Sequence, residues 1–234
     1  MQPFSIAIDG PAGAGKSSVA KIVAQRLDAM YLDTGAMYRA IGLFYLRRRQ
    51  LNQIDFIAKT VRDVDISVRF LEGAQHVFLG AEDVSEIIRT PEGSLAASAV
   101  SAIREVRLYM VELQRRIASN IPVVMDGRDI GTVVLPNATL KVYLTANAQI
   151  RAERRYAELR AKGEMPKFHE VLDDIVLRDY NDSHRAESPL CRAEDAHLLD
   201  TSNMTLNQAA DALEALFRAA IERPQSSDQG GIAQ

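Results

Sequence analysis

Residues 3–18 read PFSIAIDGPAGAGKSS, and this stretch decides the fold class. Its first seven residues form a short apolar run that ends at Gly10, which is typical of a buried parallel strand. After the glycine-rich loop, residues 16–27 place apolar side chains on one helical face, namely Val19, Ala20, Val23 and Leu27. The stretch therefore predicts a strand, a glycine-rich loop and a helix in succession.

The loop matches the phosphate-binding pattern G-x-x-x-x-G-K-[ST], in which each residue type has a physical role. Gly10 and Gly15 allow backbone angles that a Cβ would forbid, and the helix N-terminus adds partial positive charge. Lys16 is expected to reach the β- and γ-phosphates, and the Ser17 hydroxyl to ligate Mg²⁺. We expect the residues that bind ATP to be Gly10, Pro11, Ala12, Gly13, Ala14, Gly15, Lys16, Ser17 and Ser18.

Four further short apolar runs alternate with helical patterns along the chain. They predict strands over 30–33, 122–126, 140–145 and 197–200. Helices are expected over 36–49, over 91–119 with a break near Ser101, in an Arg-rich pair joined at 162–166, and over 205–222. This alternation predicts an α/β fold with a five-stranded parallel sheet flanked by helices, the architecture of phosphate-loop NTPases.

The region 60–92 has a different pattern. Val64, Ile66, Val68 and Phe70 alternate with polar residues, 72–74 suits a turn, and 75–79 suits a returning strand. We therefore predict an antiparallel insert at 60–92 in a single unit spanning 1–222, whose core is 1–59, 93–150 and 169–222. A short helical lid is expected at 151–168, and a disordered tail at 223–234.

Composition excludes several classes of protein. The 234 residues carry a net charge of −3, so no general attraction to nucleic acid is expected. No run approaches the roughly 18 apolar residues of a membrane span, and no signal peptide is evident, so we expect a cytoplasmic protein. The one cysteine, Cys191, is interpreted as a small apolar filler. Because no large uncovered apolar stripe is evident, a monomer is expected.

The sequence also narrows the reaction. It contains neither the Asn-Lys-x-Asp motif with which GTPases recognise guanine nor the Leu-Ser-Gly-Gly-Gln signature of transport ATPases. Motor ATPases usually end a strand in a paired Asp-Glu that polarises water, whereas here Asp126 is followed by Gly127-Arg128-Asp129. One acid near the metal with an arginine beside it suits transfer to an anionic acceptor better than hydrolysis.

Arginines are spaced so that they can share helical faces. Arg151, Arg154 and Arg155 fall at i, i+3 and i+4, and Arg178, Asp182 and Arg185 at i, i+4 and i+7. Further arginines lie in or near the other loops that follow strands, namely Arg39, Arg104, Arg107 and Arg128. The group favours binding of two phosphorylated ligands, and the alternative is a salt-bridged hairpin of surface helices.

Three stretches resemble bacterial cytidylate (CMP) kinases, a family of nucleoside monophosphate kinases. They are Leu32–Arg39 (LDTGAMYR), Asp126–Val134 (DGRDIGTVV) and the stretch from Arg178 to Arg185, and the resemblance covers about residues 3–222. It implies an adenylate-kinase-like fold with an insert in the monophosphate-binding region. It also implies that ATP phosphorylates CMP, and dCMP as well, by direct in-line transfer to a phosphate acceptor with Mg²⁺.

The resemblance also implies roles for individual residues. Thr34, Ser98, Arg107 and Asp129 would surround the cytosine, and Arg178 and Asp182 would meet the sugar hydroxyls. Arg39, Arg128 and Arg185 would grip the monophosphate, and Arg154 and Arg155 would close over ATP. The catalytic set would be Lys16, Arg128, Arg154, Arg155 and Arg185. The carboxylate that holds hydrated Mg²⁺ beside Ser17 is either Asp33 or Asp126.

Two rival functions remain at this point. One is a kinase for another small acceptor, such as UMP or a non-nucleotide metabolite. The other is a nucleotide-gated binding or regulatory module, which would bind ATP without consuming a monophosphate and would not need the paired arginine sets. Activity against a panel of monophosphates separates the three.

Overall fold

The computed structural model describes residues 3–71, 73–161 and 163–222. The disordered tail predicted for 223–234 therefore lies outside the described residues. The central sheet contains β1 Ser5–Asp9, β2 Met30–Asp33, β6 Val123–Gly127, β7 Leu140–Thr145 and β8 His197–Asp200. The α-helices are α1 Lys16–Arg26, α2 Thr34–Arg47, α3 Ile54–Thr60, α4 Pro91–Ser101, α5 Arg104–Ala118, α6 Ala148–Ala161, α7 Phe168–His184 and α8 Leu206–Glu222.

The central sheet runs in the order β2-β6-β1-β7-β8, and each of its neighbouring pairs is parallel. This confirms the predicted five-stranded parallel sheet. Because the strands are parallel, their carboxyl ends lie at the same edge, where ligands of such sheets bind. The phosphate-binding loop, Thr34 and the Gly127-Arg128-Asp129 turn all follow strands at this edge.

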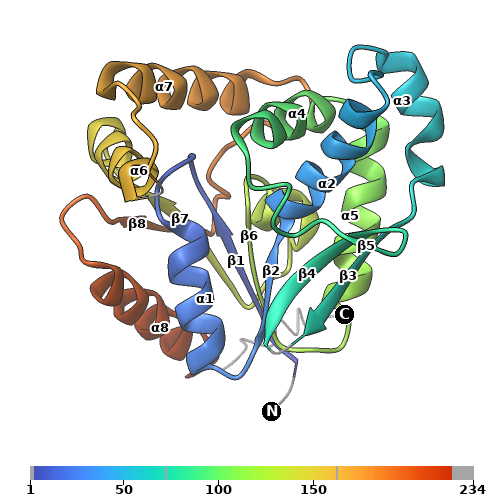
Figure 1. The fold of residues 1–234 in the computed structure, drawn as a ribbon. Coiled ribbons are helices and arrows are strands. Elements are labelled where there is room, and N and C mark those ends of the chain that lie inside the picture. The colour runs from blue at the N-terminus through green and yellow to red at the C-terminus, as the bar shows by residue number, and fades with distance from the viewer. Residues whose placement is uncertain (1–2, 72, 162, 223–234) are drawn as a thin grey trace, which may run out of the picture.

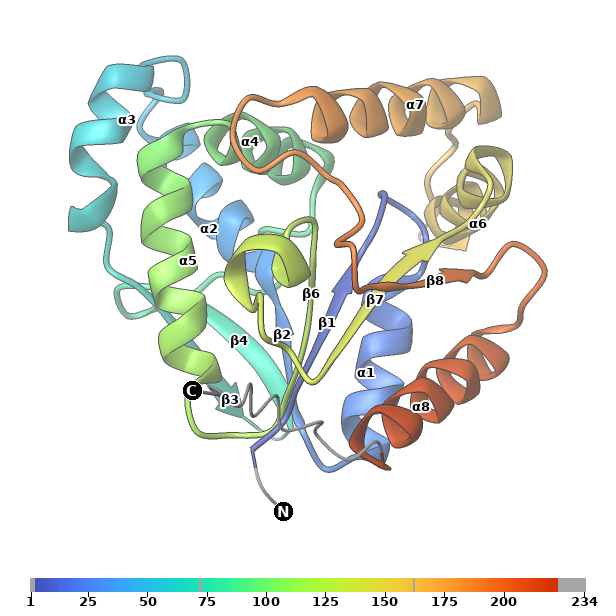
Figure 2. The same cartoon turned by 180° about the vertical axis from the view of Figure 1, so that it is seen from behind.

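Helices cover both faces of the central sheet (Figures 1 and 2). Alternate side chains of β1 point to opposite faces: Ile6 and Ile8 pack with α1 and α8, whereas Ala7 packs with α2 and α5. Both isoleucines are fully buried, and each such burial stabilises the fold by about 1.5–3 kcal/mol. This double coverage explains why β1 reads as a continuous apolar run.

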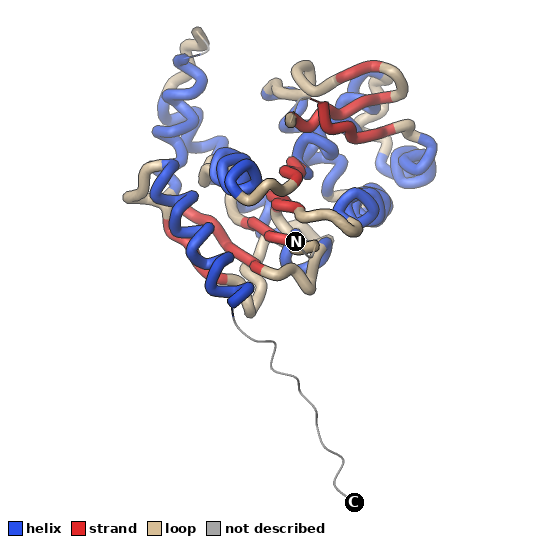
Figure 3. Tube along the Cα trace, turned by 90° about the horizontal axis from the view of Figure 1, so that it is seen from below, coloured by secondary structure: helices blue, strands red, loops and turns tan. Residues whose placement is uncertain are grey.

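A separate antiparallel sheet comprises β3 Ile66–Leu71, β4 Ala74–Leu79 and β5 Glu82–Asp83, and it lies to one side of the central sheet (Figure 3). The hairpin β3–β4 confirms the predicted antiparallel insert, although Glu72 of the predicted turn lies outside the described residues. The third strand was not predicted, because two charged residues show no alternation. The predicted division into core, insert and lid stays a prediction.

Helix ends follow local capping chemistry. Thr90 accepts a hydrogen bond from the Gly93 N–H at 3.0 Å and Pro91 begins α4, as predicted. The predicted break near Ser101 separates α4 from α5. The pair α6 and α7 is present, and its join includes Lys162, which lies outside the described residues.

Some expectations were wrong or incomplete. Cys191 is exposed, so it is not an apolar filler. The helix α3 was missed because its heptapeptide buries only Ile57 and shows no clear periodicity. A 3₁₀ turn, Val61–Asp63, and a π turn, Ile130–Val134, were also missed. None of the helices in the described ranges combines the length and the apolar character that crossing a bilayer requires.

Candidate active site

The phosphate-binding loop connects the carboxyl end of β1 to the N-terminus of α1. Gly10 has φ 146°, and a Cβ there would lie 1.9 Å from the Leu144 carbonyl oxygen, so no larger residue fits. Gly15 has φ 92° and precedes α1, whose N-terminus receives no side-chain cap from the described residues. The first N–H groups of α1 therefore remain available to an anion.

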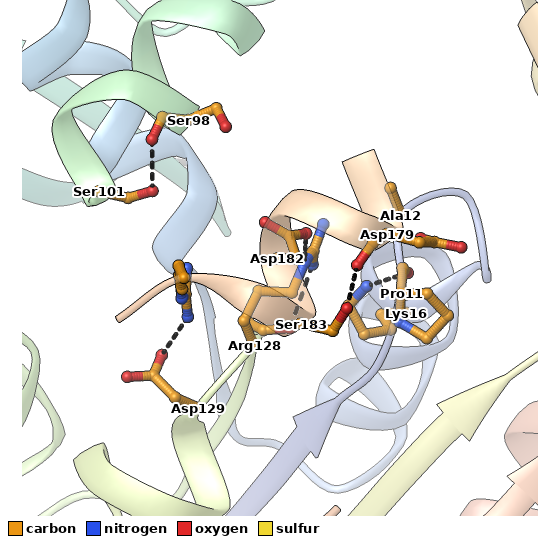
Figure 4. A network of polar contacts seen from close by, with 12 residues as sticks. Pro11, Ala12, Lys16, Ser98, Ser101, Arg128, Asp129, Asp179, Asp182 and Ser183 are labelled. Atoms are coloured by element: carbon orange, nitrogen blue, oxygen red, sulfur yellow. Dashed lines mark hydrogen bonds and ion pairs between the residues drawn. The ribbon is translucent and has the colours of Figure 1, made fainter. Parts of the chain in front are cut away.

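Lys16 lies at the centre of the loop and is buried. Its Nζ donates a hydrogen bond to the Pro11 carbonyl oxygen at 2.7 Å (Figure 4). Burial lowers the pKa of Lys16 well below its ordinary value, and the positive charge of Arg128 lowers it further. A bound anion would relieve both effects, so the position suits a phosphate.

A pocket of about 180 Å³ opens beside Lys16. It is lined by the phosphate-binding loop with the start of α1, the carboxyl ends of β2 and β6, the turn after β6, the helices α2, α4 and α5, and α7 with Arg185. The polar and charged lining residues are Lys16, Ser17, Asp33, Thr34, Tyr38, Arg39, Ser98, Ser101, Arg107, Asp126, Arg128, Asp129, Arg178, Asp182 and Arg185. The pocket therefore brings together the phosphate loop and the residues predicted to bind a monophosphate.

A larger cavity of about 940 Å³ lies between α1, β2 and the hairpin β3–β4. None of the residues predicted to bind ATP or CMP lines it, and of the two candidates for holding Mg²⁺ it includes Asp33. Because the convergent charges line the smaller pocket, chemistry rather than volume identifies the candidate site.

Positive charge dominates the middle of the pocket. Arg128 donates from Nε to Asp182 Oδ2 at 2.6 Å (Figure 4). Burial lowers the pKa of Arg178 to about 10, and the neighbouring Arg128 adds to the effect. One carboxylate therefore faces two arginines, and Lys16 adds a third cation from the opposite wall. This surplus of positive charge favours an anionic ligand.

A second ion pair closes the end of the pocket away from the phosphate loop. Arg107 donates from Nη2 to Asp129 Oδ2, and both side chains are buried. Arg107 also donates to the Ser101 carbonyl oxygen at 3.2 Å. Two buried donors, Arg107 Nε and Arg185 Nη2, have no hydrogen-bond partner within the described ranges. Because buried donors are normally satisfied, a bound ligand is the natural partner for them.

Oxygen atoms of Ser17, Tyr31 and Asp126 lie close together near Lys16. The Ser17 hydroxyl donates to Asp126 Oδ2 at 2.8 Å, and the Tyr31 hydroxyl donates to Oδ1 of the same carboxylate at 2.8 Å. Burial raises the pKa of Asp126, and the neighbouring Asp33 raises it further. Asp33 Oδ1 caps α2 by accepting from the Ala36 N–H at 2.9 Å. Hard oxygen ligands of this kind suit Mg²⁺.

The structure brings most of the predicted site residues into the pocket, but not all of them. Ser18 is exposed and does not line it. Arg104, grouped with the phosphate-binding arginines, is 64% exposed and lies 3.8 Å from Glu187. The helix that carries Arg178 and Asp182 ends at His184, so Arg185 reaches the pocket from extended backbone rather than from the predicted shared helical face.

The arginines of α6 also lie elsewhere. Arg151 is buried and donates to the Ala12 carbonyl oxygen and to Asp179, so it holds the loop and α7 together. Arg154 donates to the Thr201 carbonyl oxygen at 2.7 Å, and Arg155 pairs with Glu158 at 2.8 Å. The expected common ligand-binding face of these three residues is therefore not present in this pocket.

Sequence reasoning missed several lining residues, notably Tyr38 and Ser101. The Tyr38 ring lies below the Arg107 guanidinium, 5.7 Å from its central carbon. Burial raises the pKa of Tyr38 to about 12. The one available signal was position, because Tyr38 lies four residues after Thr34 on the same helical face.

Comparison with known proteins agrees with this geometry. The cytidylate kinase family model matches residues 6–219. A cytidylate kinase of Caldicellulosiruptor saccharolyticus is 46% identical over 94% of this chain and 98% of its own length. Another, from Caldanaerobacter subterraneus, is 51% identical over 91% of this chain and 94% of its own length. Among solved structures, an uncharacterized protein of Eubacterium ventriosum shares the fold, with a TM-score of 0.52 and 12% identity over 94% of this chain and 99% of its own. The chain belongs to the cytidylate kinase family.

Proposed function

We propose that this chain transfers the γ-phosphoryl group of ATP to CMP and to dCMP, giving ADP and CDP or dCDP. The observation that carries the proposal is the convergence of Lys16, Arg128, Arg178 and Arg185 on one pocket beside the phosphate-binding loop. The family membership supports it, since the two relatives described above are cytidylate kinases. The enzyme is then a phosphotransferase with a phosphate group as acceptor.

The reaction needs no strong base. An oxygen of the acceptor phosphate is already anionic and forms a bond to the γ-phosphorus, while the bond from that phosphorus to the β–γ bridging oxygen breaks. The electron pair leaves with ADP. Positioning and charge neutralisation then supply most of the barrier reduction. Lys16 would neutralise the transferring oxygens from the donor side, and Arg128 and Arg185 from the acceptor side, with Arg39 holding the monophosphate.

The cytosine would occupy the end of the pocket closed by Arg107 and Asp129. Cytosine offers a donor at N4 and acceptors at N3 and O2, so a carboxylate and a guanidinium are suitable partners. Ser98 would supply a hydroxyl, and its own carbonyl oxygen already accepts from Ser101. The Thr34 hydroxyl donates to the Asp126 carbonyl oxygen at 2.8 Å, which leaves its lone pairs available to the base.

The ribose would lie between base and phosphate, against Arg178 and Asp182. A carboxylate accepts hydrogen bonds from sugar hydroxyls, and Arg128 already orients Asp182. Burial raises the pKa of Asp182, but the charge and hydrogen bond of Arg128, together with the charges of Arg178 and Arg185, lower it by more, so this carboxylate is ionised at neutral pH. Because dCMP lacks one hydroxyl, its binding would lose a contact here.

The donor site has residues that fit Mg²⁺. Ser17 and Asp126 present adjacent oxygens, and Asp33 lies opposite Asp126 in the sheet register. Mg²⁺ is commonly bound through one or two carboxylates together with substrate phosphates, and the described ranges contain no cluster of three or more His, Cys, Asp and Glu that could bind a metal ion alone. We propose that Ser17 and Asp126 would hold the hydrated ion, which would supply positive charge to the ATP phosphates.

The predicted lid at 151–168, which consists largely of α6, would form the cover of the ATP site. Arg154 and Arg155 lie on α6, and Arg154 already contacts the Thr201 carbonyl oxygen beside the phosphate loop. Closure that brings these residues over ATP would exclude water, which otherwise competes as acceptor. The lid at 151–168, the insert at 60–92, the monomeric state and a cytoplasmic location belong to this proposal.

A coupled assay with ATP and a panel of monophosphates tests the function. CMP and dCMP should be phosphorylated far faster than UMP, AMP or GMP. Equal rates across the panel would remove the cytosine assignment and favour a broader kinase. ATP binding without turnover of any monophosphate would favour the regulatory module.

A further inference from the structure

Asp9 ends β1, immediately before the phosphate-binding loop, and is only 5% exposed. Its carboxylate accepts two backbone hydrogen bonds, from Ile130 N–H to Oδ1 at 2.8 Å and from Gly131 N–H to Oδ2 at 2.7 Å. These two amides directly follow Asp129. A single carboxylate thus joins the residue before the donor loop to the turn that carries the acceptor-binding side chains.

Steric constraints hold both ends of this link. Gly10 approaches the Leu144 carbonyl oxygen so closely that the end of β1 cannot shift toward β7. A Cβ on Gly131 would lie 3.3 Å from Asp9 Oδ2 and 3.1 Å from Lys141 Cδ, which is tighter than ordinary contact. The π turn Ile130–Val134 is therefore seated directly on the Asp9 carboxylate.

We propose that Asp9 is a positioning residue of the kinase, which sets Arg128 and Asp129 at the correct distance and orientation from the phosphate-binding loop. This inference rests on the proposed function. Asp9 does not line the substrate pocket, so it acts through the turn and not through contact with CMP. Phosphoryl transfer depends on the relative placement of the two nucleotides, and an error of about 1 Å can cost on the order of a hundredfold in rate.

The charges around Asp9 determine how this link depends on pH. Burial raises the pKa of Asp9 to about 6, and Asp129 raises it as well. The two amides and Lys16 of α1 act in the opposite direction, and the charge of Asp9 is also felt by Tyr143 of β7. On the same strand, Lys141 packs on Gly131 and pairs with Asp195. Above pH 6 both Asp9 oxygens accept; below it, the protonated oxygen becomes a donor that faces an N–H.

The first test compares substrates in the Asp9→Asn variant. The asparagine amide has one acceptor oxygen and one NH₂ group, so one backbone N–H loses its partner and faces a donor. We expect kcat/KM for CMP to fall by about tenfold to a hundredfold. The dissociation constant for ATP, measured without CMP, should change by about threefold or less. Gly131→Ala places a methyl group between the turn and the Asp9 carboxylate. It should likewise lower kcat/KM for CMP while changing the dissociation constant for ATP little.

Asp211→Asn on α8 is the matched control, because it removes a 64% exposed carboxylate that pairs with Arg26 on α1 and not with any residue of the turn. It should leave both parameters unchanged. If Asp9→Asn weakens ATP and CMP equally and lowers the melting temperature, Asp9 only supports folding and the proposal is overturned. Unchanged kcat/KM for CMP in both Asp9→Asn and Gly131→Ala would overturn the proposal as well.

A second measurement needs no catalysis. In the ¹⁵N-labelled protein without nucleotide, the amide resonances of Ile130 and Gly131 should titrate together with a midpoint near pH 6. Asp9→Asn should abolish that titration, and Asp211→Asn should keep it. The proposal fails if the two amides titrate identically with and without the Asp9 carboxylate. If the monophosphate panel shows no turnover at all, the proposed function fails, and the titration still reports separately on the link.

Discussion

The two halves of the pocket are built in different ways. The donor half is a continuous stretch, Gly10 to Ser17, in which Lys16, backbone N–H groups and a helix N-terminus supply the positive charge. The acceptor half is assembled from side chains on α2, α4, α5, the turn after β6, and α7, between Thr34 and Arg185. A loop of consecutive residues can be recognised in a sequence by itself. A site whose residues are distant in sequence depends on the packing that brings them together.

The two halves also differ in the desolvation free energy that folding requires of their polar and charged groups. Backbone amides at a helix N-terminus stay hydrogen-bonded to water or to phosphate and need no partner of opposite charge. The acceptor half instead buries the ion pair of Arg107 with Asp129 and nearly buries that of Arg128 with Asp182. Such pairs cost several kcal/mol of desolvation per ion, to be offset by attraction and hydrogen bonds. The acceptor half should therefore be the more sensitive to substitution in terms of stability.

The largest effect is expected in the donor half. Lys16→Ala should lower turnover by several powers of ten, on the order of the 10³- to 10⁵-fold that one charge-neutralising residue supplies in phosphoryl transfer. The fold should remain intact, because within the described residues the Lys16 ammonium donates to a loop carbonyl and forms no ion pair. Lys21→Ala on the exposed face of α1 is the control. Steady-state kinetics and a melting curve measure both, and near-normal turnover in the first variant would remove Lys16 from the mechanism.

The second effect is on stability, in the acceptor half. Arg107→Met removes one partner of a buried pair and leaves Asp129 with the more distant Arg185, at 4.0 Å, as its counter-charge, which should cost about 3–5 kcal/mol of unfolding free energy. Arg62→Met is the matched control, because Arg62 pairs with Glu112 of the same helix α5 but is 59% exposed. Urea unfolding compares the two. Equal, small losses would contradict the difference argued between the two halves.

Arg128→Lys should have a smaller and more specific effect. Lysine keeps the charge but loses the planar fork that donates to Asp182 and to phosphate. A charged hydrogen bond is worth about 1.5–3 kcal/mol, so kcat/KM for CMP should fall by about tenfold to a hundredfold. ATP affinity should be unchanged, which isothermal titration can check. A comparable loss of ATP affinity would mean that the two halves do not act separately.

The smallest effect concerns the contact between the insert and the central sheet. The Gln75 side chain of β4 accepts from the Asp33 N–H at 2.6 Å and donates to the Asp33 carbonyl oxygen at 3.1 Å. Gln75→Ala should cost about 1 kcal/mol of stability, because water can replace part of these bonds. Since Asp33 precedes Thr34, the KM for CMP should rise by a few-fold. Gln25→Ala, an exposed residue of α1, should change neither quantity, and a larger effect there would mean that the loss is not specific to this contact.

The fold could be predicted largely because its patterns are local. Apolar runs and helical periodicity marked the five parallel strands and most helices, and alternation marked the hairpin β3–β4. The π turn Ile130–Val134 could not be predicted, because its geometry depends on a carboxylate 121 residues earlier in the chain. The helix α3 escaped for a different reason, since Phe56 is 41% exposed and one buried residue makes no pattern.

The residues of the candidate site could be predicted from the sequence, but their arrangement in space could not. Thr34, Ser98, Asp129 and Asp182 were assigned through the family resemblance, and they line the pocket together. Their roles remain part of the proposed function. Arg151 was grouped with ligand-binding arginines by its spacing, yet it is buried against Ala12 and Asp179. Helical spacing determines which residues share a face but not what that face packs against.

By itself, then, the sequence determined the donor loop, because a run of glycines followed by Lys16 and Ser17 performs its chemistry through its own backbone and the helix that follows. The family resemblance named the arginines of the acceptor half, but only the tertiary structure showed that they line one pocket and that Arg104 does not. Arg104 and Arg107 lie one helical turn apart, yet the first is exposed and the second is buried beside Asp129. The difference arises because a charge acquires its role from what packs around it, and those neighbours come from distant parts of the chain.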